Sequence, residues 1–280
     1  MMYLGISREN TFSPNRVGGD KAIFDSVALE LGCDSNMVFK MPEDEFARDG
    51  AGDVSMYDAV FHMCRSDRAL TRLIEIEKVG IPVVNRPDAV INCRRINEVR
   101  LLQNSAVSFV RSEIVNTGEF PENWSLFPCW VKRGDSHSIQ QDDVCYVEDP
   151  EALHRILDRM AERGFGEVVL QEHVQGHICK FYGIGNGLLF KHRFLENVGE
   201  GKFGLEFYNE RGLTDVDEEK FRTDVSSIAE ILGIDIYGGD AVVDHNGHAV
   251  IVDFNDWPSF FICRTEAAAV ISELIGQRKE

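Results

Sequence analysis

Residues 236–259 read IYGGDAVVDHNGHAVIVDFNDWPS, and this stretch decides the fold. Two apolar runs flank the dipeptide Asn246-Gly247, which is a preferred centre for a two-residue hairpin turn. A turn of this kind fixes the register of the two strands that it joins. It predicts three facing pairs, namely His245 with His248, Val243 with Val250, and Asp240 with Asp253.

The facing pair Asp240 and Asp253 indicates a function. Two carboxylates directly opposite each other repel and destabilise a bare strand pair. Asn255 lies two residues after Asp253 and therefore on the same face. A divalent cation would remove the repulsion, because Mg²⁺ prefers carboxylate and amide oxygens. The alternative is a pair of solvated surface acids, but the neighbouring residues are apolar on both faces, which favours a buried metal site.

A second hairpin is predicted over residues 178–194, with Asn186-Gly187 at its turn. The register gives two facing pairs, Lys180 with Arg193 and Tyr182 with Lys191. Three cations on one face of an apolar ribbon favour an anionic ligand, and a triphosphate meets that requirement. The alternative is a solvated edge from which long basic side chains reach water. Together the two hairpins predict a site for a nucleotide and magnesium.

The first 85 residues follow a different pattern from the remainder. Strand-like runs at 2–6 and 57–64 alternate with helical patterns at 21–31 and 70–77. This alternation predicts a small α/β unit with parallel strands.

Residues 86–280 combine helices and strands without that alternation. Helical patterns lie at 96–103 and 221–232, and strand-like runs lie at 109–115 and 129–132. Asp149-Pro150-Glu151 predicts a helix start, because it offers an N-cap, a proline at the first position and an early acid. We expect one domain over 1–85 and a second over 86–280, divided into subdomains of about 86–165 and 166–280.

Composition restricts the class of partner. The formal net charge of −18 argues against nucleic acid or an anionic membrane, although a few local cations can still hold ATP. No apolar run approaches the ~20 residues that span a bilayer, and the N-terminus does not resemble a signal peptide, so we expect a cytoplasmic protein. The seven cysteines are scattered, with no Cys-x-x-Cys pair, which predicts reduced thiols.

The acidic hairpin resembles the metal motif of the ATP-grasp superfamily, which includes D-alanine–D-alanine ligase, glutathione synthetase and ribosomal-protein glutamate ligases. That motif is an acid, any residue and an asparagine shortly before a proline, and here it reads Asp253-Phe-Asn255 before Pro258. Asp240 resembles the preceding metal ligand. The resemblance implies an ATP-grasp fold, of mixed α/β and α+β class, after a Rossmann-like domain over residues 1–84.

Other segments resemble the nucleotide-binding positions of the superfamily. Residues 168–174 resemble the hinge strand that contacts adenine, and Lys132 resembles the strand lysine that holds the α- and β-phosphates. Arg95 stands where an upstream lysine is more usual. From the hairpins and the resemblance together, we expect ATP to be bound by Arg95, Lys132, Gln171, Glu172, His173, Val174, Lys180 and Lys191.

The sequence also departs from the superfamily pattern. Asp253 is shorter than the glutamate of many members, and residues 133–138 lack the usual glycine-rich lid. Arg193 and Asn197 have the spacing of the Arg-x-x-x-Asn substrate signature, in different surroundings.

The reaction that the resemblance implies is ligation of a carboxylate to an amine. ATP would phosphorylate the substrate carboxylate, and the amine would then displace phosphate. Asp240, Asp253 and Asn255 would hold Mg²⁺ between the β- and γ-phosphates. The expected catalytic residues are Lys180, which would hold the phosphate chain, and Arg193, which would stabilise the acyl phosphate.

Two alternatives stay open at this point. One is an ATP-grasp kinase resembling inositol polyphosphate kinases, and the other is a non-catalytic ATP-binding protein. For the ligase, the expected partners are ATP, a small acid and an amine, and a homodimer is as open as a monomer.

Overall fold

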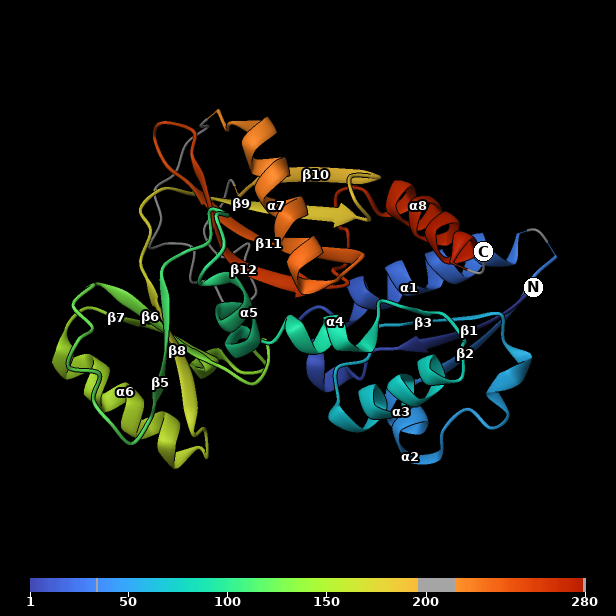
Figure 1. The fold of residues 1–280 in the computed structure, drawn as a ribbon, viewed down its shortest axis with the longest axis horizontal. Helices are drawn as coiled ribbons and strands as arrows, with labels where there is room; N and C mark the ends of the chain where they lie inside the picture. The colour runs from blue at the N-terminus through green and yellow to red at the C-terminus, as the bar shows by residue number, and fades with distance from the viewer. Residues whose placement is uncertain (34, 196–214, 279–280) are drawn as a thin grey trace.

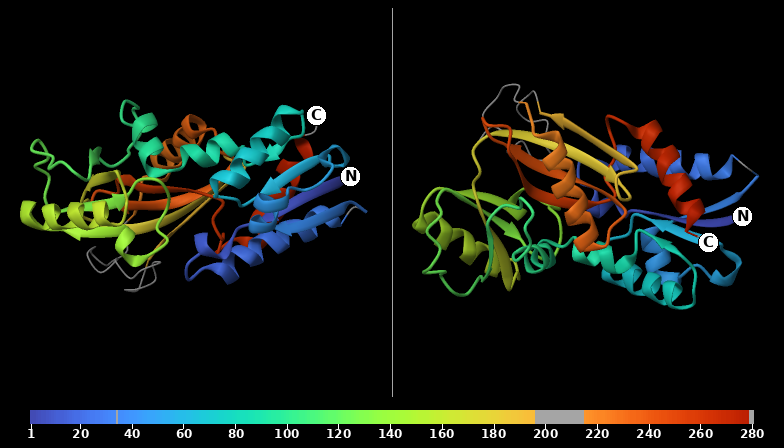
Figure 2. Two further views of the ribbon diagram at one scale, coloured as in Figure 1. Left: turned by 90° about the horizontal axis from the view of Figure 1, so that it is seen from below. Right: turned by 45° about the horizontal axis from the view of Figure 1, so that its top comes forward.

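A computed structural model of the chain describes residues 1–33, 35–195 and 215–278 (Figure 1). These residues build three four-stranded sheets that are covered by helices. The sheets lie side by side in an elongated molecule, and Figure 2 shows the same arrangement from two further directions.

The N-terminal sheet is parallel, with strand order β2-β1-β3-β4, as the alternating pattern predicted. Its residues alternate between two cores, so that Tyr3 contacts one layer of helices and Leu4 contacts the other. Helices α1 and α8 cover one face, and α2 and α3 cover the other. The elements are β1 (Met2–Ser7), β2 (Met37–Pro42), β3 (Ala59–His62), β4 (Val83–Val84), α1 (Val17–Gly32), α2 (Glu43–Asp49), α3 (Asp67–Lys78) and α8 (Arg264–Gln277).

The second sheet is antiparallel, with strand order β5-β8-β6-β7, and helix α6 packs on it. The helix begins as the sequence predicted, because Asp149 Oδ1 accepts the N–H of Ala152 at 2.7 Å and Pro150 follows the cap. The elements are β5 (Ser112–Asn116), β6 (Cys129–Arg133), β7 (Val144–Val147), β8 (Glu167–Glu172) and α6 (Pro150–Glu162).

The third sheet contains both predicted hairpins, in the order β10-β9-β11-β12. Helix α7 packs its apolar stripe on this sheet and ends at Gly233, whose left-handed backbone (φ 73°) forms the C-cap. The elements are β9 (His177–Ile184), β10 (Leu189–Phe194), β11 (Ile236–Val243), β12 (Ala249–Asp256) and α7 (Glu218–Leu232).

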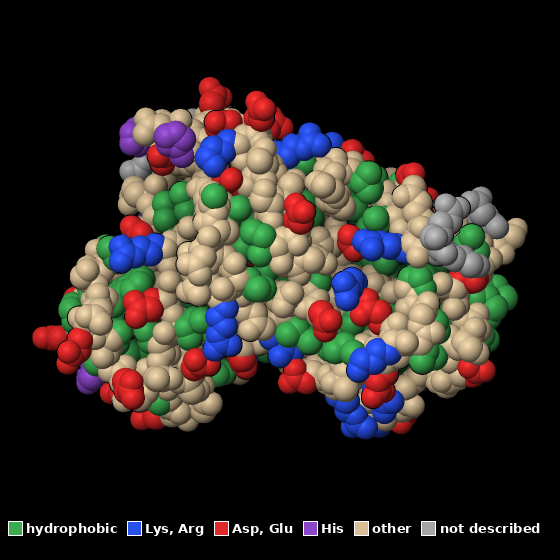
Figure 3. Space-filling model, viewed as in Figure 1, with side chains coloured by type: hydrophobic (Ala, Val, Ile, Leu, Met, Phe, Trp, Pro, Cys, Tyr) green, Lys and Arg blue, Asp and Glu red, His purple; other side chains and the backbone are tan. Residues whose placement is uncertain are grey.

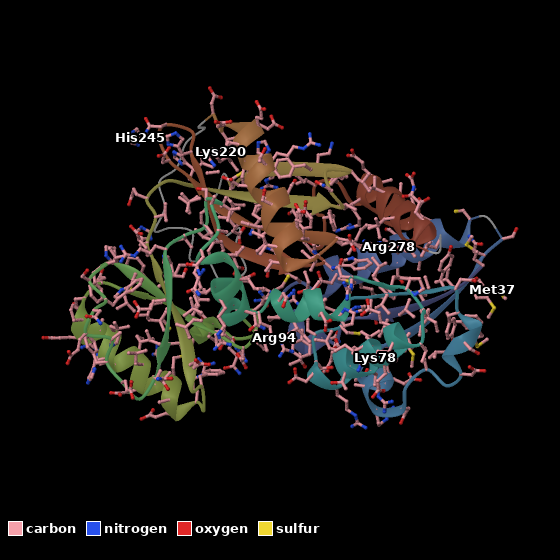
Figure 4. All side chains as sticks on the ribbon, in the orientation of Figure 1. Met37, Lys78, Arg94, Lys220, His245 and Arg278 are labelled. Carbon is pink, nitrogen blue, oxygen red and sulfur yellow. The ribbon has the colours of Figure 1, made fainter. Side chains whose placement is uncertain are left out.

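Short segments connect the three sheets. Helices α4 (Pro87–Asn92) and α5 (Arg95–Leu102) follow the first sheet, and 3₁₀ turns lie at Asn10–Phe12, Val54–Met56 and Gln141–Asp143. The chain then pairs with the outer edge of β12, where Ser108 O and the Val110 N–H both bond to Ile251, before it enters β5. Two surface ion pairs also cross between units, Arg94 with Asp67 and Arg278 with Asp235, each at 2.5 Å (Figure 4).

The cationic hairpin has the register that the sequence predicted. Lys180 faces Arg193 and Tyr182 faces Lys191, although four residues rather than two connect β9 to β10. The sequence did not show that β9 also pairs with β11. This pairing joins the two hairpins into one sheet and places Lys180 beside Asp240.

The acidic hairpin differs from its predicted register. The turn has three residues, because the Asp244 N–H donates to His248 O, and Gly247 takes a left-handed backbone (φ 83°). The predicted pairs His245 with His248 and Val243 with Val250 are therefore wrong, and Val243 faces Ala249 instead. A bulge at Val252 then shifts the register back by one residue, so that Asp240 does face Asp253.

Three features of the described residues bear on the surroundings of the protein, namely surface charge, helix length and the state of the cysteines. Acidic and basic side chains are interspersed over the face shown in Figure 3. None of the described helices combines the length and the apolar character that crossing a membrane requires. All seven cysteines are free thiols, as the scattered spacing predicted.

Asn85 fastens the first sheet to the third. Its side chain is buried, donates to Ile236 O at 2.8 Å, and accepts the N–H groups of Ile236 and Asp235 at 2.7 and 3.2 Å. On the other side, the neutral ring of His62 bonds to Asn85 O at 2.8 Å. The Asn85 side chain thus makes the backbone hydrogen bonds at the start of β11 that a neighbouring strand would otherwise make.

We expect Asn85→Ala to lower the free energy of unfolding by about 2–4 kcal/mol. The variant leaves the buried N–H of Ile236 without its partner and removes one of the two donors to Ile236 O, the other being the Trp257 N–H. Chemical denaturation measures this change. Asn92→Ala is the matched control, since Asn92 donates one hydrogen bond of 3.1 Å, to Leu232 O, and is only partly buried. An equal loss in the two variants would contradict the role given to Asn85.

Candidate active site

A cavity of about 600 Å³ lies where the three sheets meet. Its walls come from loops of the first sheet, from β6 and β8 of the second, and from β9, β11 and β12 of the third. All the residues that the sequence predicted for the site line this cavity, with the exception of Lys191. The structure therefore brings together groups that are up to 160 residues apart in the chain.

The acidic end of the cavity is built on β11 and β12. Asp240 and Asp253 face each other, and Asn255 Nδ2 donates to Asp253 Oδ2 at 3.0 Å. Close strand packing requires the glycine before Asp240, because a Cβ on Gly239 would lie 2.1 Å from Asp253 O. β11 and β12 thus place two carboxylates and one amide oxygen close together at this end of the cavity.

Two cations keep Asp253 ionised. Burial would raise the pKa of its carboxyl, but the charges of Arg95 and Lys132 lower that pKa well below its usual range. Arg95 Nε donates to Asp253 Oδ1 at 3.3 Å from the first turn of α5. The guanidinium also donates to Ser136 O and Ser138 Oγ, which orients the loop after β6.

Lys132 is held by the bulge of the acidic hairpin. Its Nζ donates to Val252 O at 2.9 Å, and Val252 is the residue that has no partner in the register of β11 and β12. Burial lowers the pKa of the Lys132 ammonium to about 8, against the opposing charge of Asp253. The irregularity that brings Asp240 opposite Asp253 therefore also supplies the acceptor that positions Lys132.

The three cations of the second hairpin have different surroundings. Lys180 Nζ pairs with Asp240 Oδ1 at 2.5 Å, and Arg193 lines the cavity beside it. Lys191 instead pairs with Glu266 of α8 at 3.1 Å and does not line the cavity. Of the three cations predicted to surround one ligand, Lys180 and Arg193 therefore line the cavity and Lys191 does not.

The predicted hinge forms another wall of the cavity. Gln171, Glu172, His173 and Val174 lie at the end of β8 and all line it. The Trp130 indole N–H donates to His173 Nδ1 at 3.1 Å, and Gln171 Nε2 donates to Ser112 Oγ at 3.3 Å, so that both side chains are fixed. The apolar side chains of Ile178 and Val242, which face each other on β9 and β11, add a surface suited to a flat aromatic ring.

The N-terminal wall of the cavity has no counterpart among the residues predicted from the sequence. Asp256 is 2% exposed and binds Arg8 at 2.8 Å and Arg65 at 2.7 Å, and the ring of His137 lies 3.5 Å away. Arg8 continues to Asp20 at 2.9 Å. Burial lowers the pKa of His137 to about 4, so the ring is neutral at pH 7. This ion cluster connects β12 to the loops after β1 and β3.

Solved structures with similar folds cover almost the whole chain. D-alanine–D-alanine ligase from Bacillus anthracis, complexed with ATP, superposes with a TM-score of 0.73 at 13% identity, over 100% of this chain and 97% of that one. A RimK-domain ATP-grasp protein from Sphaerobacter thermophilus gives 0.67 at 15% identity, over 98% and 99%. The ATP-grasp ligase PsnB, complexed with a minimal precursor, gives 0.62 at 15% identity, over 99% and 98%. The chain has the ATP-grasp fold.

No family model and no curated protein matches the sequence, so the likeness extends to the ATP-grasp fold and not to an activity. The cavity holds the residues that the sequence predicted for nucleotide and metal, apart from Lys191.

The donor set of the cavity suits magnesium better than a transition metal. Among the described residues there is no group of three or more His, Cys, Asp and Glu side chains that could hold an ion alone. Asp240, Asp253 and Asn255 offer two carboxylates and an amide oxygen. Mg²⁺ commonly uses one or two protein carboxylates and takes its other ligands from phosphates and water.

The low pKa of Lys132 predicts a pH dependence of nucleotide affinity. A bound phosphate would favour the charged ammonium and raise its pKa above about 8, so binding takes up a proton. The affinity for ATP–Mg²⁺ should therefore be highest below pH 8 and fall by about tenfold between pH 7.5 and 9.5. Isothermal titration at both pH values tests this. Lys132→Arg keeps its charge and should show little change; an equal fall in that variant would contradict the assignment to Lys132.

Proposed function

We propose that the protein is an ATP- and magnesium-dependent ligase that activates a carboxylate as an acyl phosphate for attack by an amine. One observation carries the proposal. Two opposed carboxylates and an amide on β11 and β12 share a single cavity with Lys132, Arg95 and a hinge segment. The ATP-grasp ligases among the similar structures support the same class of reaction, and D-alanine–D-alanine ligase is an example.

Binding of ATP would use the two ends of the cavity. The adenine would lie at the hinge, against Gln171 to Val174 and the apolar side chains of Ile178 and Val242. The phosphates would extend toward Lys132 and Arg95, which already approach Asp253 from two sides. Asp240, Asp253 and Asn255 would hold Mg²⁺, which would supply charge neutralisation at the β- and γ-phosphates.

The protein groups align the reactants and neutralise charge. Phosphoryl transfer needs little covalent help from an enzyme, so positioning and electrostatic stabilisation carry the rate. Lys180 would turn from Asp240 toward the phosphate chain when the metal takes its place, because both bind the same carboxylate. Arg193, which faces Lys180 across β9 and β10, would stabilise the acyl phosphate.

Thermal unfolding in the presence of nucleotides tests the binding step of this proposal. ATP should raise the midpoint by several degrees when Mg²⁺ is present, and ATP alone should have a smaller effect. GTP serves as the matched control, because the hinge should read the base. No response to any nucleotide would overturn the proposal.

Product analysis tests the chemistry. Mixtures of small acids and amines should release inorganic phosphate and ADP together with an amide. A stable phosphorylated product would instead identify a kinase. Binding of ATP–Mg²⁺ without turnover of any acceptor would identify a non-catalytic nucleotide-binding protein.

A further inference from the structure

The β6–β7 loop, residues 134–143, contributes His137 and Ser138 to the wall of the cavity. It contains one glycine, Gly134, so its backbone has less conformational freedom than that of a glycine-rich lid. This glycine is fixed by packing on α5, because its carbonyl accepts the Ile96 N–H at 3.1 Å and a Cβ would lie 2.3 Å from the Ile96 side chain. The beginning of the loop is therefore attached to α5.

Asp143 holds the other end of the loop. Its side chain is fully buried, and Oδ2 accepts the N–H groups of Ile139 at 2.7 Å and Gln140 at 2.9 Å. Oδ2 also accepts from Arg133 Nη1 at 3.1 Å, and Oδ1 accepts from Arg163 Nη2. Burial would raise the pKa of the Asp143 carboxyl, but these hydrogen bonds lower that pKa below its usual value. The carboxylate is therefore charged at neutral pH and uses both of its oxygens.

The two arginines are themselves fixed outside the loop. Both guanidinium groups lie over the ring of Phe165, at 4.8 Å from its centre for Arg133 and 4.9 Å for Arg163. Arg163 is the C-cap residue of α6 and also donates to Asp142 O at 2.8 Å. Asp143 thus connects the loop to β6 and to α6. All of these contacts are made within the protein, so they do not require a ligand.

The loop in turn supports a cation of the cavity. Arg95 Nη1 donates to Ser136 O at 3.1 Å and Nη2 donates to Ser138 Oγ at 3.2 Å, while Nε donates to Asp253. A displaced loop would release Arg95 from two of its acceptors. It would thereby loosen a guanidinium that the proposed function gives to the phosphates.

We propose that Asp143 is a positioning residue for nucleotide binding, which fixes the β6–β7 loop as a standing wall of the cavity rather than a lid that closes over ATP. The inference rests on the proposed function, because the wall adjoins the residues assigned to the phosphates. Nucleotide binds only to the fraction of molecules in which the loop is in place, and Asp143 keeps that fraction close to one.

Hydrogen exchange of the full chain, followed at single amides by NMR, tests this inference. The amides of Ile139 and Gln140 are the reporters, because they donate to Asp143 and neither residue is among the described residues that line the cavity. In the wild type we expect slow exchange at both amides without nucleotide, and a change of less than about twofold when Mg²⁺ and a non-hydrolysable ATP analogue are added. Fast exchange that the analogue slows by about tenfold or more would identify a closing lid and overturn the inference.

Asp143→Asn tests the residue itself. Asparagine keeps the shape of the side chain but removes the charge and turns an amide N–H group toward a guanidinium. We expect exchange at Ile139 and Gln140 to rise by about tenfold or more, and the affinity for the analogue with Mg²⁺ to fall about tenfold. A saturating amount of the analogue should restore slow exchange, because it selects the molecules with the loop in place; a merely structural role predicts no such recovery. Unchanged affinity in spite of faster exchange would contradict the positioning role.

Two further variants complete the test. Asp135→Asn is the matched control, because Asp135 also pairs with Arg133, at 2.8 Å, but its side chain is 58% exposed and water screens the pair. It should change exchange and affinity by less than about twofold. Arg163→Lys applies the same test from α6 and decides the matter if Asp143→Asn does not fold. Lysine keeps the charge but lacks the fork that binds Asp143 and Asp142 O together, so exchange should rise and affinity fall by about threefold. No change in either quantity would overturn the inference.

The nucleotide response separates this inference from the proposed function. A wild type that binds the analogue and only then protects the two amides would overturn the standing wall alone. A wild type that binds no nucleotide would overturn the ligase proposal, and slow exchange at Ile139 and Gln140 would still support a fixed loop.

Discussion

Asp253→Asn should reduce ATP turnover by at least ~10³-fold while the protein stays folded. The substitution removes the negative charge that two cations, Arg95 and Lys132, surround, and it removes a ligand that Mg²⁺ prefers. The shape of the side chain is conserved, and an asparagine oxygen can still accept from Arg95 Nε, which now donates at 3.3 Å. The loss should therefore lie in catalysis and in the Mg²⁺ dependence of ATP binding.

Phosphate release measures the loss of catalysis. The rise in unfolding midpoint that ATP causes with and without Mg²⁺ measures the Mg²⁺ dependence of ATP binding. Asp244→Asn is the matched control, since Asp244 belongs to the same hairpin but lies at its turn, outside the cavity, where it accepts the N–H groups of Asn246 and His248. That variant should keep nearly full turnover. Unchanged turnover in Asp253→Asn would remove this residue from the metal site.

The sequence could predict the centre of the site because hairpin pairing is a local property. A dipeptide with turn preference and two apolar runs placed Asp240 opposite Asp253, and the structure confirms this pair. The turn itself differs from the two-residue turn that the dipeptide predicted. A three-residue turn and a bulge at Val252 shift the register in opposite directions, and their effects cancel at the acidic pair. Sequence pattern alone does not show such a compensation.

The N-terminal wall could not be predicted for a different reason. Arg8 and Arg65 stand next to strands, where basic residues are ordinarily solvated. Nothing local indicates that they meet Asp256, which lies 248 and 191 residues later in the chain. The same limit applies to α8, which packs on α1 across the length of the chain. These contacts depend on how the three sheets are arranged, and periodicity reports only the structure within each segment.

Asp256→Asn should lower the free energy of unfolding by about 3–5 kcal/mol. The Asp256 carboxyl is 2% exposed and is the shared partner of two buried guanidinium groups. Burial would raise its pKa, but Arg65 and Arg8 hold that pKa far below its usual range, so the charge is present at all ordinary pH values. Without it, two buried cations lose their counter-charge, and the first sheet loses its attachment to β12.

Asp25→Asn provides the control, because Asp25 also sits between two cations, Lys21 and Lys40, but its side chain is 37% exposed. Water screens that cluster, so its loss should cost no more than about 1 kcal/mol. Chemical denaturation of both variants compares the loss of one negative charge at a buried position with the same loss at a partly exposed position. Equal, small losses would show that water reaches the Asp256 cluster. The attachment of the N-terminal sheet to β12 would then have to rest on Asn85 and apolar packing.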